Sequence, residues 1–72
     1  MNSEWVLKHH ELLQLMLKLD LQKSMILRII DEVNRLLKTP EAAIRKTEEF
    51  ISILKKCKTE ADVAKMLDEM GL

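Results

Sequence analysis

Glycine and proline, the residues that most often make tight turns, are nearly absent from this chain. Among its 72 residues there is one of each, Pro40 and Gly71. Two-residue β-hairpins need residues that tolerate positive φ, above all glycine, so the chain lacks the turns from which a hairpin-built sheet is made. Its apolar residues are mostly Leu, Ile, Met and Val, and the only aromatic residues are Trp5 and Phe50. These features predict an all-α fold.

The clearest helix signal is Thr39-Pro40-Glu41. It combines a Thr cap, a proline at the first helical position, where its missing N–H is not needed, and an acid in the positively polarised first turn. Gly71 is a typical residue for ending the last helix. We predict a single domain covering residues 1–72, a small compact bundle of four helices at about 3–18, 21–38, 40–57 and 60–70.

The remaining helix starts also carry capping residues. Asn2 or Ser3 is expected to cap the first helix, and Asp20 the second. Thr59, followed three residues later by Asp62, is a capping-box variant with Asp in place of Glu, and it predicts the start of the fourth helix.

The first helix differs from the others in the spread of its apolar residues. At about 100° per residue, the other three helices show one-sided apolar stripes, whereas the apolar residues of the first cover roughly 200° of its circumference. They are Trp5, Val6, Leu12, Leu13, Leu15, Met16, Leu17 and Leu19. Either this helix is central and packed by two or three others, or its second face contacts another chain. We predict the second arrangement, a homodimer through the first helix.

The expected interaction surface combines apolar residues of the first helix with two leucines that lie off the main stripes of their helices. It comprises Trp5, Leu7, His9, Leu12, Leu15, Met16, Leu19 and Leu27. An imidazole on an otherwise apolar face can make packing or dimerisation sensitive to pH near 6, so His9 is also a candidate pH sensor.

The sequence His9-His10-Glu11 invites a metal-binding interpretation. Two ligands on one helix must lie three or four residues apart to face the same ion, and adjacent side chains diverge by about 100°. Four residues after His9 and His10 come Leu13 and Gln14, which are not metal ligands of this kind. We therefore predict no metal site.

Other reactive residues also lack the partners that catalysis needs. Cys57 is the only cysteine and falls on the apolar stripe of the third helix, near its C-terminus, where the helix dipole disfavours a thiolate. Ser24 and Ser52 have no histidine nearby in the sequence, and the near absence of glycine excludes a phosphate-binding loop. We predict that the protein is not an enzyme and binds no cofactor.

The stretch TEADVAKMLDEMGL, residues 59–72, resembles the opening helix of a helix-turn-helix DNA-binding unit, with a capping Thr and Gly-Leu where the turn begins. The resemblance implies a transcriptional regulator. With the fourth helix as the reading helix, however, its polar residues would include four acids, which repel phosphate. Twelve basic residues balance twelve acidic ones along the whole chain. Nucleic acid is therefore disfavoured as a ligand.

No run of uncharged residues exceeds six, far short of the roughly 20 that span a bilayer, and the N-terminus lacks a signal-peptide pattern. We expect a cytoplasmic protein without a membrane segment. The predicted function is a non-catalytic protein–protein interaction module, a modulator, inhibitor or adaptor similar in style to small accessory proteins of bacteria and phages. The alternatives are a transcriptional regulator, a purely structural oligomer and a designed bundle.

Overall fold

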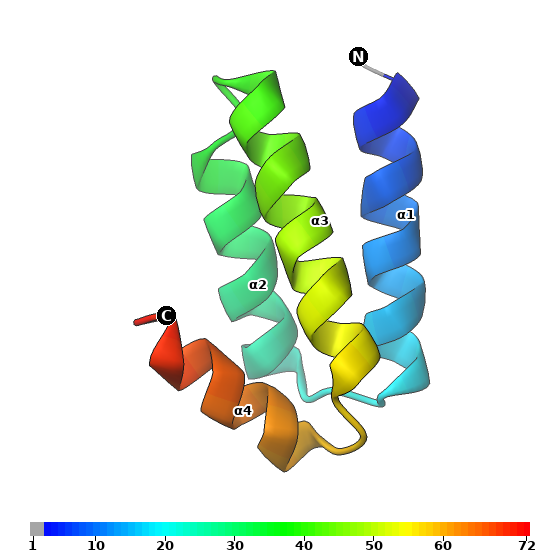
Figure 1. Ribbon diagram of the computed structural model, residues 1–72, viewed down its shortest axis with the longest axis vertical. Helices are drawn as coiled ribbons and strands as arrows, with labels where there is room; N and C mark the ends of the chain where they lie inside the picture. The colour runs from blue at the N-terminus through cyan, green and yellow to red at the C-terminus, as the bar shows by residue number, and fades with distance from the viewer. Residues whose placement is uncertain (1–2) are drawn as a thin grey trace.

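The computed structural model describes residues 3–72, and within that range it contains four α-helices and no strand. The helices are α1 (Ser3–Lys18), α2 (Lys23–Arg35), α3 (Pro40–Lys56) and α4 (Glu60–Glu69) (Figure 1). The prediction of an all-α fold with four helices is confirmed. Met1 and Asn2 lie outside the described residues, and so does the expected role of Asn2 as a cap.

Helix α3 is the central helix of the bundle. In Figure 1, α1, α2 and α3 run alongside one another, α1 and α3 in one direction and α2 in the other, while α4 crosses the lower end. Helix α3 contacts each of the other three, and α1 packs mainly against α3. The interpretation that the first helix is central is therefore wrong. One side of α1 faces α3, and α1 forms one edge of the bundle.

The core is built from the apolar stripes of all four helices, with Phe50 of α3 fully buried. Its buried apolar residues are Leu12, Met16, Leu21, Met25, Ile29, Val33, Ala43, Ile44, Phe50, Ile51, Leu54, Cys57, Val63 and Leu67. A folded monomer of this mass exposes about 4,600 Å², and the chain exposes 4839 Å². A single copy therefore buries its core about as well as an ordinary small monomer does.

The start of α3 has the predicted proline but lacks the predicted side-chain cap, whereas the start of α4 has the expected chemistry in full. Helix α3 begins with Pro40 after an extended Thr39, although the Thr39 side chain makes no capping hydrogen bond. At the start of α4, the backbone N–H of Asp62 donates to Thr59 Oγ1 at 3.3 Å, and the backbone N–H of Thr59 donates to Asp62 Oδ2 at 3.1 Å. The capping box is confirmed, and it ties the loop after α3 to the first turn of α4.

The expected cap of α2 is wrong. Asp20 has a φ of 53° and lies at the end of α1 rather than the start of α2. It occupies the left-handed position that often ends a helix, where the backbone N–H of Leu21 reaches back to the carbonyl oxygen of Met16 at 3.3 Å. The N-cap of α2 is Gln22, and α2 begins at Lys23 instead of residue 21.

Helix α2 also ends earlier than predicted, at Arg35 instead of residue 38. The next residues form tight turns, in which Leu36 N–H donates to Val33 O and Thr39 N–H donates to Leu36 O. These turns let the chain reverse before Pro40, whose ring disfavours a helical conformation at the preceding residue. The other predicted ends are accurate to one residue, since α3 ends at residue 56 and α4 at residue 69.

Helix α4 covers the end of the bundle and is attached to α2 at both of its ends. The backbone N–H of Gln22 donates to Glu60 Oε2 at 2.9 Å. The Arg28 guanidinium bonds to Asp68 Oδ1 at 3.2 Å and to the carbonyl oxygen of Leu72. Among the helices of residues 3–72, none has the length and apolar character needed to cross a membrane.

Candidate interaction surface

Large apolar side chains that remain exposed are confined to the first half of the described chain. Leu7 and Leu17 of α1 are each 70% exposed and Val6 is 43% exposed. Leu27 of α2 and Leu37 in the turn after it are 47% and 44% exposed. Within residues 3–72, α3 and α4 have no exposed apolar side chain of comparable size. The candidate interaction surface therefore centres on α1.

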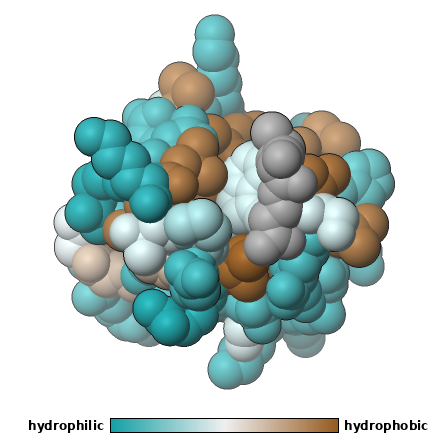
Figure 2. All heavy atoms as spheres, turned by 90° about the horizontal axis from the view of Figure 1, so that it is seen from above, coloured by the Kyte–Doolittle hydropathy of each residue, from teal (hydrophilic) through white to brown (hydrophobic). Residues whose placement is uncertain are grey.

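The apolar residues of α1 divide into two faces. Leu12 and Met16 point into the core against α3. At 100° per residue, Val6, Leu13 and Leu17 share a second line about 100° around the helix from that direction. We call the line formed by Val6, His10, Leu13 and Leu17 the outer stripe. Apart from half-buried Leu13 its members are exposed. Figure 2, a view onto the end of the bundle where α1 begins, shows hydrophobic atoms reaching the surface among hydrophilic ones.

The structure corrects the predicted interaction surface at two positions. Leu12 is 0% exposed and Met16 is 1% exposed, so neither is available to another protein. Both lie within the broad apolar arc from which the sequence predicts a surface, yet they occupy the part of that arc that α3 covers.

The other predicted residues lie in three settings. Trp5, Leu15 and Leu19 are half-buried and pack against the core, whereas Leu7 and Leu27 are exposed. His9 is half-buried. The prediction omitted the outer stripe positions Val6, His10, Leu13 and Leu17. Their three- and four-residue spacing is visible in the sequence, but the direction of the core was needed to place them outside.

Trp5 and His9 form a stacked pair one turn apart on α1. Their ring centroids lie 4.8 Å apart with an interplanar angle of 21°. Trp5 Nε1 and His9 Nδ1 are both shielded from solvent and have no hydrogen-bond partner among residues 3–72. The stack fixes His9 beside the core instead of on the outer stripe, so the histidine of the exposed apolar line is His10.

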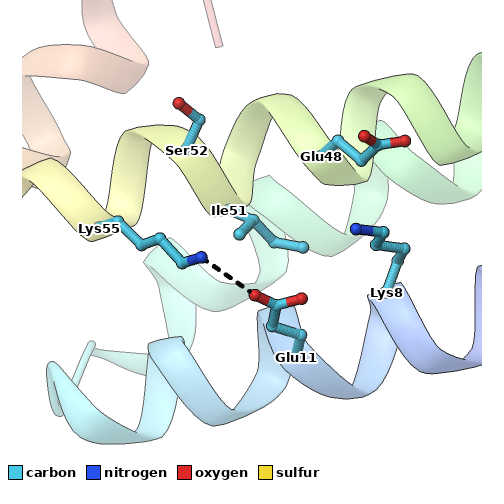
Figure 3. A pocket seen from close by; sticks show the side chains of 6 residues that line it. All are labelled: Lys8, Glu11, Glu48, Ile51, Ser52 and Lys55. Atoms are coloured by element: carbon cyan, nitrogen blue, oxygen red, sulfur yellow. Dashed lines mark ion pairs between the residues drawn. The ribbon is translucent and has the colours of Figure 1, made fainter.

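A shallow cavity of about 260 Å³ lies between α1 and α3. Its lining consists of two lysines, two glutamates, a serine and an isoleucine, namely Lys8, Glu11, Glu48, Ile51, Ser52 and Lys55. Lys55 Nζ lies 3.3 Å from Glu11 Oε1, and Figure 3 shows Lys8 pointing towards Glu48. Because the charges balance and alternate between the helices, this cavity offers no net charge to an ionic ligand. The ion pair between Lys55 of α3 and Glu11 of α1 supports the packing of these two helices.

The one thiol considered for chemistry is in an unreactive setting. Cys57 lies in the core, and burial together with the nearby Asp62 carboxylate raises the pKa of its thiol above the ordinary value of 9.0. Backbone hydrogen bonds from Lys58 and Thr59 lower the pKa of Asp62, which is the capping carboxylate of α4. Within residues 3–72, no three His, Cys, Asp or Glu side chains are grouped so that they could hold a metal ion.

The fold and its surface define a small helical bundle that carries an exposed apolar line along its edge helix. Comparisons with models of known protein families, with curated proteins and with solved structures gave no match. The function must therefore be inferred from the residues themselves.

Proposed function

We propose that this protein is a non-catalytic protein–protein interaction module that self-associates through the outer face of α1, which comprises the outer stripe and the neighbouring Leu7. The observation that carries this proposal is the exposure of Leu17 on the outer stripe and of Leu7 at its flank, each 70% exposed. Scattered exposed leucines are common in monomers. Here they lie with Val6 on a single helix at the edge of the bundle, and such grouping is typical of contact surfaces.

The size of the apolar surface sets the expected strength. Burying a whole Leu or Val side chain contributes about 2 kcal/mol, so covering the exposed fractions of Leu7, Leu17 and Val6 contributes roughly 4 kcal/mol per copy. Association itself costs at least about 4 kcal/mol. With the additional contact of Leu13, we expect a weak dimer with a dissociation constant between about 10 µM and 1 mM.

The geometry of α1 agrees with a weak interface. A helix of 16 residues is about 24 Å long. One helix pair of that length buries an area at the low end of specific interfaces, below about 1,200 Å² in total. Such contacts are typical of proteins that exchange partners, which suits a modulator or adaptor better than a permanent structural oligomer. The buried, protonated thiol of Cys57 favours a role without nucleophilic chemistry.

Heteronuclear NMR of labelled protein over a dilution series tests this proposal. The amide signals of Val6, Leu13 and Leu17 are expected to shift with concentration, whereas those of α4 are not. Leu17→Glu should abolish the shifts because it places a charge on the outer stripe. Leu27→Glu, a matched change at an exposed leucine of α2, should leave them intact. Concentration-dependent shifts centred on α4 instead of α1 would contradict the proposal.

A further inference from the structure

The outer stripe is symmetric along α1. Its members Val6, His10, Leu13 and Leu17 follow one another at spacings of four, three and four residues. This order of spacings is the same from either end. A two-fold axis that crosses α1 midway between positions 11 and 12 therefore superimposes the stripe on itself in the opposite direction.

Building on the proposed self-association, we propose that the partner of this surface is a second copy of the chain whose α1 lies antiparallel to the first, with Val6 against Leu17 and His10 against Leu13. Alternating spacings of three and four residues are those of two helices that pack side by side with interlocking side chains. Pairing across a two-fold axis makes each contact occur twice, as closed dimers require. The antiparallel register gives two Val–Leu layers and two His–Leu layers.

His10, the polar residue of the stripe, and the ends of α1 favour an antiparallel pair over a parallel one. A parallel pair would place His10 against His10, which brings two imidazole rings together. The antiparallel pair places each His10 imidazole on a leucine. It also places the C-terminal end of each α1, where the helix dipole is negative, beside Ser3, the first residue of the other α1. The amide groups at a helix N-terminus attract negative charge, so the ends of the pair are electrostatically complementary.

The surface around the stripe is open for such a partner. Helix α1 lies at the edge of the bundle, with α3 on its core side (Figure 1). Leu7 borders the stripe and is 70% exposed, so it can add apolar contact at the flank. Because a single copy already buries its core, the two copies can separate without unfolding.

Disulfide trapping between single-thiol variants tests the register. Val6→Cys and Leu17→Cys are made separately in a Cys57→Ala background, and both positions are exposed enough for the variants to fold. The two proteins are mixed at a concentration at which light scattering shows that the mixture is dimeric, and then oxidised. Antiparallel pairing predicts that the mixed Val6→Cys/Leu17→Cys disulfide exceeds either homodisulfide by at least about tenfold, because only that pair brings the two Cα atoms within disulfide range. Leu27→Cys serves as the control for random collision.

The outcomes separate this inference from the proposed self-association. Dominant Val6→Cys homodisulfides would show parallel helices and would overturn the inference while leaving self-association intact. Disulfide yields no higher than those of Leu27→Cys, in a mixture that is dimeric, would also overturn it. If light scattering shows that the unmodified protein is monomeric up to millimolar concentration, the self-association on which the inference rests is refuted.

Discussion

Two leucines of α1, five residues apart, give the sharpest test of how this helix divides its apolar surface. Leu12 is fully buried and Leu17 is 70% exposed, although a sequence pattern alone treats them alike. Truncating a buried leucine to alanine costs about 2–5 kcal/mol of folding free energy. A chain of 72 residues has a total stability of roughly 4–11 kcal/mol. Leu12→Ala is therefore expected to remove about half of the stability or more.

Leu17→Ala is expected to act on association instead of folding. Only 30% of this side chain is covered within one copy, which corresponds to less than about 1 kcal/mol of folding free energy. Covering the exposed 70% at a dimer interface contributes about 1.4 kcal/mol per copy, or about 3 kcal/mol for two copies. Leu17→Ala should therefore raise the dissociation constant of the dimer about 100-fold.

Urea unfolding is followed by circular dichroism in protein dilute enough to be monomeric. It measures how much each substitution changes the free energy of unfolding. Light scattering of concentrated protein measures how much each substitution changes the dissociation constant of the dimer. The expected result is a large loss of stability in Leu12→Ala and a loss of association in Leu17→Ala. Equal losses of folding stability in dilute samples of the two variants would refute the division of α1 into a core face and an outer face.

Further predictions concern the helix ends and the thiol. Thr59→Ala removes the capping hydroxyl of α4 and should lower the free energy of unfolding by about 1 kcal/mol in urea titrations; an unchanged midpoint would contradict the role of the capping box. Because the pKa of Asp62 is lowered in the folded state, the unfolded chain takes up that proton first, so stability should fall as the pH drops below the ordinary value of 3.8. Thermal melts should show a smaller acid-induced fall for Asp62→Asn. Asp20→Gly relieves a left-handed backbone conformation and should raise stability by about 1 kcal/mol, and a decrease in the melting temperature would contradict this. The Cys57 thiol should react with iodoacetamide far more slowly in the native protein than in urea, because it is buried and its pKa is raised; equal rates would contradict its placement in the core.

Local chemistry explains which parts of the fold were predictable. Pro40 and the Thr59 and Asp62 pair define helix starts through interactions with residues a few positions away, so the sequence predicts those starts directly. Asp20 was misassigned because aspartate is favoured both as an N-cap and at left-handed positions. The choice between these roles depends on how α1 ends, and the backbone hydrogen bond from Leu21 to Met16 settles it.

The interaction surface was less predictable because it depends on tertiary packing. The apolar arc of α1 spans two faces, and its width indicates a second contact without showing which half faces inward. The packing of α3 against Leu12 and Met16 fixes the inward half. Leu7, Val6 and Leu17 are all exposed, and the surface position of Val6 and Leu17 follows from the direction of the core.

Sedimentation equilibrium of the unmodified protein measures whether it associates with itself, as proposed for α1. Samples between about 10 µM and 1 mM cover the range of dissociation constants expected from the exposed apolar surface. We expect a reversible monomer–dimer equilibrium, with an average mass that rises towards twice 8.4 kDa as concentration increases. A mass that stays at 8.4 kDa at every concentration would contradict it.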